Sequence, residues 1–338
     1  MTERARSLGF AALALLAVGG LGCHDSQASK QGAAAEVAKP TEIRLDYATY
    51  NLSSLVLKKQ GLLDAELAKD GIAVRWVFSA GSNKANELLA SGSVDFASTA
   101  GAAALLARTN GVPLRVIYVY SKPEWAALVV GPGSSITQVA DLKGKKVAAT
   151  RGTDPFFFLL RSLAAVGLHQ SDIELVHLQH GDGRQALIRG DVDAWAGLDP
   201  FMASAELRDH ARLVYRNIDF NSFGTLNARE DFLAKYPAQA QRVIAHYEQA
   251  RRWILAHKPE AAALLAAEGK IEPDVALKQI VERTVLDHDV GIPGEALHQA
   301  LVAVAPILTS EKLVGAGADP TRALAELIAP AAAQAVIK

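Results

Sequence analysis

The chain has 338 residues, of which 50% are hydrophobic and 21% are charged, and its formal net charge is −1 at pH 7. A chain of this length and composition has enough apolar residues for two ordinary globular domains. The near-neutral charge balance excludes a strongly basic protein, so we expect no nucleic acid as a partner.

The first 23 residues differ in kind from the rest of the chain. Two arginines precede an apolar run over residues 8–18, and a small residue precedes Cys23, the single cysteine. This pattern predicts a secretory signal peptide over residues 1–23, too short to span a membrane. Cys23 resembles the lipidated cysteine of bacterial lipoproteins, although Gly20 stands where Leu is usual in that motif. We therefore expect a periplasmic protein with a lipid anchor on Cys23; the alternative is a plain signal peptide cleaved before residue 36.

Residues 24–40 are polar and rich in alanine, which predicts a flexible linker. Because the chain has one cysteine, no intrachain disulfide is expected, and the stability of the fold has to come from packing.

From residue 41 the chain alternates predicted strands with predicted helices. The predicted strands of a first cycle are residues 43–47, 74–78, 94–97 and 114–120. Those of a second cycle are residues 125–130, 147–150, 173–178 and 192–196. Asn51 or Ser53 is expected to cap the first helix, and Thr153 or Asp154 to cap the helix that Pro155 opens. This alternation predicts an α/β fold with mixed, mostly parallel sheets and helices on both faces.

The two cycles predict two lobes joined by two crossings. We assign residues 41–121 and 218–338 to lobe 1 and residues 122–217 to lobe 2, which is thereby inserted into lobe 1. After an extended segment at 223–229 the chain is helical to its end, and we expect this tail to serve packing only. In open α/β sheets a ligand lies beyond the carboxyl ends of the strands, so a cleft between the lobes is the expected site.

Two consecutive turns of lobe 1 carry hydroxyl groups and glycine at helix starts. The turn at 79–83 and the turn at 98–101 each follow a strand and open a helix without a bulky or acidic side chain. Unpaired N–H groups and the positive end of the helix dipole make such a turn suitable for a small oxyanion. The alternative is that these residues only cap their helices. The ligand-binding residues predicted here are Ser79, Gly81, Ser82, Asn83, Thr99, Ala100 and Gly101.

Further candidates stand at other strand ends. Tyr50 and Asn51 follow the first strand, and we favour ligand contact for both. Trp125 is expected either as an apolar wall of the cleft or as a core residue, and the same alternatives hold for Trp195. For Asp154 and Asp199, capping is the first expectation and ligand contact the second. The remaining candidates, at the strand end before Asp154, are Thr150, Gly152 and Thr153.

Signatures of enzymes are missing from the sequence. It has no Gly-x-Ser-x-Gly motif, no Walker loop and no His-Glu-x-x-His motif. The histidines have no convincing metal spacing, and no carboxylate pair suggests acid–base chemistry. We therefore expect no catalytic residue, no bound metal and no cofactor.

Several of these segments together resemble a known family. Residues 47–51, 76–84 and 92–104, and then 139–147, 152–154 and 190–200, are similar to the aliphatic-sulfonate-binding proteins of ABC importers. The resemblance implies a periplasmic-binding fold of the second topological type, hinge closure over the ligand and delivery to a membrane permease. It also implies a sulfonate-contact role for Asn51, for the turns at 79–83 and 99–101, and for Thr153.

The chain departs from this family at two points near the expected cleft. Ala102, Ala103 and Ala104 stand where many relatives have Asp-Ala-Pro, and Leu52 stands where Pro is common. The expected ligand is a sulfonate or a taurine-like anion. The alternatives are binding or synthesis of a thiamine-precursor pyrimidine on the same fold, and binding of a nitrate-type anion. The expected partners are the transmembrane subunits of the permease, and the protein itself is expected to be a monomer.

Overall fold

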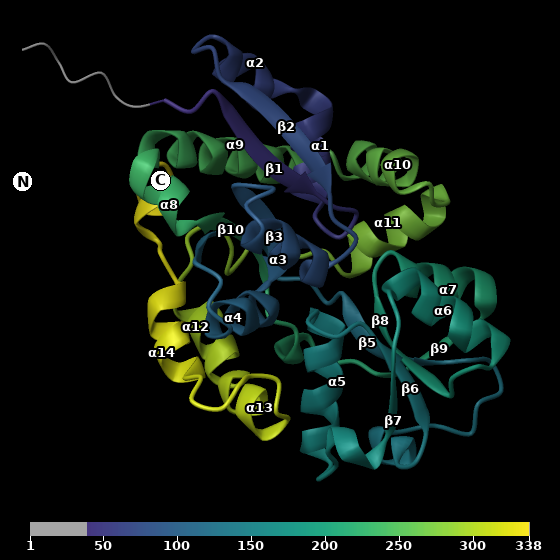
Figure 1. Ribbon diagram of the computed structural model, residues 1–338. Coiled ribbons are helices and arrows are strands. Elements are labelled where there is room, and N and C mark those ends of the chain that lie inside the picture. Colours follow the sequence, from purple (N-terminus) through teal and green to yellow (C-terminus); the bar gives the residue numbers. More distant parts are fainter. Residues whose placement is uncertain (1–38, 338) are drawn as a thin grey trace, which may run out of the picture. The chain divides into compact units, whose positions relative to one another are not determined.

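Two five-stranded mixed sheets form the framework of the protein, whose computed structural model describes residues 39–337 (Figure 1). These residues belong to one unit that begins at Ala38. The predicted signal peptide, Cys23 and nearly all of the predicted linker lie outside the described residues.

The first sheet has the strand order β2-β1-β3-β10-β4. Strand β1 pairs in parallel with β2 and β3, whereas β10 lies antiparallel between β3 and β4. The strands are β1 (Glu42–Tyr47), β2 (Ala73–Phe78), β3 (Phe96–Ala100), β4 (Leu114–Ser121) and β10 (Gly224–Arg229).

The second sheet has the order β7-β6-β8-β5-β9. Here β5 lies antiparallel between β8 and β9, so each sheet contains one strand that opposes the others. The strands are β5 (Ala126–Val130), β6 (Lys146–Ala149), β7 (Glu174–His177), β8 (Ala194–Leu198) and β9 (Arg212–Tyr215). The predicted α/β class with two mixed sheets is confirmed. Strand β9 was not predicted, because four half-exposed residues beside a helix end carry too little pattern.

Helices connect the strands within each sheet. In the first cycle they are α1 (Leu52–Gln60), α2 (Leu62–Ala68), α3 (Ser82–Ala90) and α4 (Gly101–Thr109). In the second cycle they are α5 (Asp154–Ala165), α6 (His180–Arg189) and α7 (Phe201–Asp209). Short 3₁₀ turns are η1 (Val139–Leu142), η2 (Gln170–Asp172) and η3 (Ile218–Phe220).

The predicted helix starts are confirmed in part. Asn51 is the N-cap of α1, and its side chain accepts a hydrogen bond from Ser54 N at 3.2 Å. At α5 the N-cap position belongs to Thr153, but its hydroxyl donates to Thr150 O instead of capping the helix.

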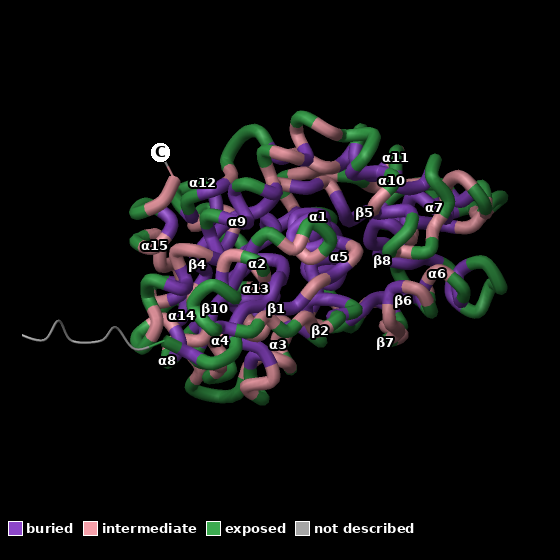
Figure 2. Tube along the Cα trace, turned by 90° about the horizontal axis from the view of Figure 1, so that it is seen from above, coloured by how far each residue is buried: buried purple, intermediate pink, exposed green. Residues whose placement is uncertain are grey.

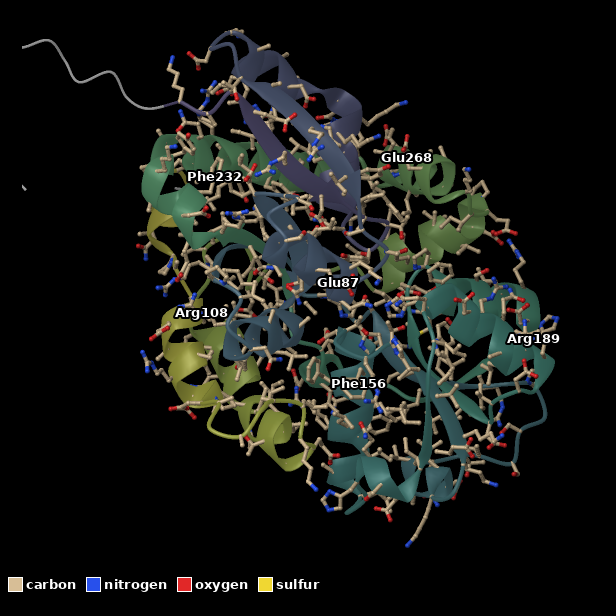
Figure 3. All side chains as sticks on the ribbon, viewed as in Figure 1. Glu87, Arg108, Phe156, Arg189, Phe232 and Glu268 are labelled. Atoms are coloured by element: carbon tan, nitrogen blue, oxygen red, sulfur yellow. The ribbon has the colours of Figure 1, made fainter. Side chains whose placement is uncertain are left out.

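The core lies along both sheets and under the helices that cover them (Figure 2). Ile43, Leu45 and Phe96 are completely buried in the first sheet, and Trp195 is completely buried in the second. Trp195 is therefore a core residue. On α5 three consecutive phenylalanines are buried, and Phe156, the first of them, is marked in Figure 3.

Strand β3 runs through Ala100, so residues 98–100 belong to a strand and not to the predicted turn. The reason is β10, which pairs with β3 up to the register Gly224↔Ala100. A partner strand that lies more than a hundred residues away leaves no local signal in the sequence.

The C-terminal tail is helical as predicted, and it reaches both sheets. Helix α9 packs against α1 and β4, while α11 packs against α7 of the second sheet. Among the described helices, none combines the length and the apolar character needed to cross a membrane. The helices are α8 (Glu230–Lys235), α9 (Pro237–Ala256), α10 (Lys258–Gly269), α11 (Pro273–Glu282), α12 (Glu295–Val302), α13 (Ala305–Ser310), α14 (Pro320–Leu327) and α15 (Ala331–Gln334).

Candidate functional site

A small enclosed cavity lies at the edge where strands of both sheets meet the crossings. Its volume is about 20 Å³, enough for about one water molecule. It is bounded by the segment after β1, the end of β4, the first crossing, the end of β8 and the segment from α11 onward. The lining residues are Tyr50, Leu52, Ser53, Tyr120, Ser121, Pro123, Trp125, Asp199, Gln279, Arg283, Thr284 and Leu286.

The N-terminus of α1 forms one wall of this cavity. Asn51 caps Ser54 N, which leaves the N–H groups of Leu52 and Ser53 at the open end of the helix. Both residues line the cavity and are buried. The positive end of the α1 dipole therefore faces the cavity, where it favours a negative group.

Arg283 supplies a buried cation at the opposite wall. Its guanidinium donates to both carboxylate oxygens of Asp199, at 2.8 and 3.2 Å, and to Glu206. Arg283 is 2% exposed and Asp199 is 1% exposed. Burial raises the pKa of Asp199 to about 6, although the nearby guanidinium opposes this rise. The two carboxylates accept from the two terminal nitrogens of the guanidinium, and Nε is the guanidinium nitrogen that has no hydrogen-bond partner within residues 39–337.

Three hydrogen-bond donors that line the cavity have no partner within residues 39–337. They are the hydroxyl groups of Ser53 and Tyr120 and the Nε–H of Arg283, and all three atoms are buried. An unpaired buried donor costs about 1–3 kcal/mol, so three in one cavity lining are unusual for a core that serves packing alone. An acceptor with several oxygens would satisfy them.

The two turns of the first sheet that were predicted to bind an anion donate hydrogen bonds to a carboxylate of the protein itself. Asp46, completely buried at the end of β1, accepts from Ser79 Oγ at 2.7 Å and from both N and Oγ of Ser98 at 2.7 Å. Burial raises its pKa to about 6, with the hydrogen bonds from Ser79 and Ser98 opposing the rise. The expectation that no carboxylate stands at these turns is therefore wrong. That expectation rested on the residues of the turns alone, whereas Asp46 reaches the turns from the neighbouring strand β1.

The backbone N–H groups at the N-terminus of α4 also have hydrogen-bond partners within the protein. Gly101 N donates to Ser222 O at 3.0 Å, and Ala102 N donates to Ser222 Oγ at 2.8 Å. Ser222 in turn donates its N–H to Asp154, which also accepts from Trp125 Nε1 at 2.6 Å. The second crossing thus links the start of α4 to the start of α5.

The N-termini of α3, α5 and α6 lie close together near the cavity. A Cβ on Gly81, the N-cap of α3, would stand 3.2 Å from Nε2 of His180, the first residue of α6. A Cβ on Gly152, just before α5, would stand 3.7 Å from Cβ of Asn83. We call these four residues the helix-start junction. Ser79, two residues before Gly81, lies 3.1 Å from the hydroxyl of the cavity residue Tyr50, so the junction adjoins the cavity.

The predicted ligand residues fall into three groups, and their contacts with a ligand stay predictions. Those that line the cavity are Tyr50, Trp125 and Asp199. Those in the helix-start junction are Gly81, Asn83 and Gly152. Those held in hydrogen bonds within the protein are Asn51, Ser79, Ser82, Thr99, Ala100, Gly101, Thr150, Thr153 and Asp154.

Sequence reasoning missed several residues of this site. Arg283 and Gln279 lie on the tail, which was expected to serve packing only. Their side chains reach the cavity because α11 packs on α7 of the second sheet. Ser53 and His180 carried a weak signal, since each stands in the first turn of a helix that follows a strand end.

Two mixed sheets whose strand ends and crossings enclose a cavity form the fold of the periplasmic ligand-binding proteins. An alkanesulfonate-binding protein SsuA from Xanthomonas axonopodis pv. citri, solved bound to MOPS, superposes with a TM-score of 0.75 at 25% identity. That likeness covers 85% of this chain and 98% of the other. The periplasmic aliphatic sulphonate binding protein SsuA from Escherichia coli superposes with a TM-score of 0.74 at 27% identity, over 86% of this chain and 93% of the other.

Sequence comparison agrees with the structural likeness. A relative from Escherichia coli strain K12, named as an aliphatic sulfonates-binding protein, is 31% identical over 236 residues, which are 69% of this chain and 73% of the relative. The family model described as "NMT1/THI5 like" matches residues 67–262. The chain belongs to this NMT1/THI5-like family.

Proposed function

We propose that the protein is the periplasmic solute-binding component of an ABC importer and that it captures an organic sulfonate between its two sheets. The names of the relatives and of the superposed structures support the ligand class and the periplasmic location. The observation that carries the proposal for this chain is the cavity, where unpaired donors meet the N-terminus of α1.

A sulfonate suits this cavity for three physical reasons. It stays ionised at every physiological pH, so it benefits from the α1 dipole and from Arg283 without a proton change. Its three oxygens can accept from Ser53, Tyr120 and Arg283 Nε. Asp199 and Glu206, which would repel it, are held by the other nitrogens of the guanidinium.

The volume of the cavity sets a condition on binding. At about 20 Å³ it is smaller than the four heavy atoms of a sulfonate group require. Binding therefore requires the two sheets to move apart at the segments 122–125 and 216–223 and to close again over the ligand. The closed form presents the permease with a surface that depends on the ligand. We propose the predicted contacts of Tyr50, Trp125 and the helix-start junction as parts of this same site.

Removing an unpaired hydroxyl tests the proposal without damage to the fold. Ser53→Ala and Tyr120→Phe each remove a group that has no partner in the described chain, so the melting temperature should not fall. By calorimetry each variant should bind ethanesulfonate about ten- to a hundredfold more weakly, because a hydrogen bond to a charged group contributes about 1.5–3 kcal/mol. Tyr247→Phe is the matched control, since its hydroxyl is also buried and unpaired within residues 39–337 but does not line the cavity.

Arg283→Gln and Arg189→Gln form a second pair. Arg189 is exposed at the end of α6, as Figure 3 shows, so its variant should bind like the wild type. Arg283→Gln should lose measurable sulfonate binding. If the wild type binds neither alkanesulfonates nor taurine, or if it prefers nitrate or a pyrimidine to them, the assignment fails.

We further propose that the protein binds and releases its ligand without chemical change, as a monomer anchored by lipid on Cys23. The names of the relatives support binding rather than catalysis. Recovery of the sulfonate unchanged after incubation, sedimentation of the purified protein and labelling of cells with a radioactive fatty acid test these three points.

A further inference from the structure

The second crossing holds a bulky residue in a backbone conformation that such residues rarely adopt. Phe223 has φ 65°, which lies in the left-handed region. A residue with a Cβ has a higher free energy there than in the extended region, and an aromatic residue at this φ is an outlier. Such strain persists only where the surrounding structure imposes it, so the place of Phe223 in the fold has to account for it.

Phe223 lies between an anchor on the second sheet and an anchor in the first. Two residues before it, Asn221 Oδ1 accepts from the N–H of Ala126, the first residue of β5, at 3.1 Å. Directly after it, Gly224 begins β10 and pairs with Ala100 of β3. A rotation of one sheet relative to the other therefore has to change the backbone angles between these two anchors, where Phe223 stands.

Contacts from both sheets and from both crossings hold the strained conformation. The carbonyl oxygen of Phe223 accepts from Gly101 N, at the start of α4, at 3.1 Å. Its ring lies under the ammonium of Lys122 in the first crossing, with Nζ 5.7 Å from the ring centroid. The preceding residue, Ser222, donates its N–H to Asp154 of α5 at 3.0 Å. Because these contacts join elements of both sheets, they require the sheets to lie close together.

A cavity beside Phe223 gives its ring room to move. The volume of this cavity is about 260 Å³, and Phe223 lines it together with Lys122 of the first crossing, Ile218 of the second crossing, Arg161 of α5 and residues of α12. When the backbone of Phe223 rotates, the ring can enter this space without displacing core residues.

The described arrangement of the sheets is the close one, since the candidate site between them has room for about one water molecule. We propose that Phe223 is a positioning residue whose backbone strain opposes closure: the left-handed conformation is imposed when the sheets close on the ligand and is released when they separate. This inference rests on the proposed function. The strain favours the open form of the ligand-free protein, and it lowers the affinity for the ligand by the same factor.

Two substitutions at this position separate the backbone strain from the ring. Phe223→Gly and Phe223→Ala both lose the ring and its contact with Lys122, but only glycine adopts φ 65° without strain. By calorimetry, Phe223→Gly should bind ethanesulfonate about tenfold more tightly than Phe223→Ala. By small-angle X-ray scattering without ligand, Phe223→Gly should have the smaller radius of gyration, because its closed form is more populated.

A second pair of variants keeps a larger side chain in case the small residues unfold the crossing. Phe223→Asn and Phe223→Leu are similar in size, and asparagine tolerates the left-handed region better than leucine does. Phe223→Asn should therefore bind ethanesulfonate more tightly than Phe223→Leu.

His210 supplies the matched control. It is also a left-handed residue other than glycine, with φ 53°, but it is exposed and ends α7 within the second sheet. His210→Gly and His210→Ala should have equal affinities for ethanesulfonate and equal radii of gyration.

The outcomes distinguish this inference from the proposed function. Equal affinities of Phe223→Gly and Phe223→Ala, or tighter binding by Phe223→Ala, would overturn the role of Phe223 while leaving sulfonate binding intact. If neither the wild type nor any variant binds a sulfonate, the proposed function fails. The radii of gyration of the ligand-free Phe223 variants then still decide whether the strain opposes closure, since equal radii would overturn it.

Discussion

Asp46 is the buried group whose substitution gives the clearest quantitative prediction. Its carboxylate is completely buried and accepts hydrogen bonds from Ser79 and Ser98. No cation is among the groups that shift its pKa, which burial raises from 3.8 to about 6. Asp46→Asn keeps the shape and an acceptor oxygen toward Ser98 but removes the ionisation.

The sign and size of the effect follow from proton linkage. Because the folded protein binds this proton more tightly than the unfolded chain, the stabilising contribution is complete below pH 3.8 and is lost as the pH rises through about 6. A factor of ten in proton affinity is worth about 1.4 kcal/mol, so the loss amounts to about 3 kcal/mol. Between pH 4 and pH 7 the wild type should therefore lose about 2 kcal/mol of unfolding free energy relative to Asp46→Asn, and the rest of the difference appears below pH 4.

Urea unfolding of both proteins at several pH values measures this difference. Asp141→Asn is the control, because hydrogen bonds from the backbone at Thr137 lower the pKa of Asp141, and its contribution is lost only as the pH falls below 3.8. The difference between Asp141→Asn and the wild type should thus stay constant from pH 5 to pH 7. A difference between Asp46→Asn and the wild type that is equally constant would refute the reasoning.

Two further substitutions test hydrogen bonds that hold the predicted turns in place. Ser82→Ala should lower the unfolding free energy by about 1–3 kcal/mol in urea, because Ser82 Oγ is the acceptor for the buried N–H of Ala100 at 2.9 Å. Ser222→Ala should destabilise by about 2–3 kcal/mol, since it removes a donor to Asp154 and the acceptor for Ala102 N. An unchanged urea midpoint in either variant would show that the bond does not stabilise the fold.

The order of strands and helices was predictable from the sequence because apolar alternation and turn residues are local signals. Capping chemistry predicted Asn51 or Ser53 as the N-cap of α1, and the structure has Asn51 there. The extent of β3 and the existence of β9 did not follow. Each depends on a partner strand that is distant in the sequence, and local propensity does not encode that partner.

The candidate site was predictable at the level of strand ends but not at the level of side chains. Tyr50 and Trp125 were identified because they stand where strands meet loops. Asp46 was missed because a polar residue inside a strand reads as solvent-facing, and only the packing of β1 between β2 and β3 buries it. Arg283 was missed because it lies at the end of α11, whereas its partner Asp199 is 84 residues away, directly after β8.

The position of β10 has a consequence for how the chain is assembled. The second sheet uses only strands between Ala126 and Tyr215, so all of its pairings are available once that stretch has been synthesised. The first sheet lacks the strand between β3 and β4 until Gly224–Arg229 has emerged. A nascent chain ending before Gly224 therefore exposes the edge of β3 and leaves β4 without a strand partner, and unpaired strands of this kind are sites for chaperone binding or aggregation.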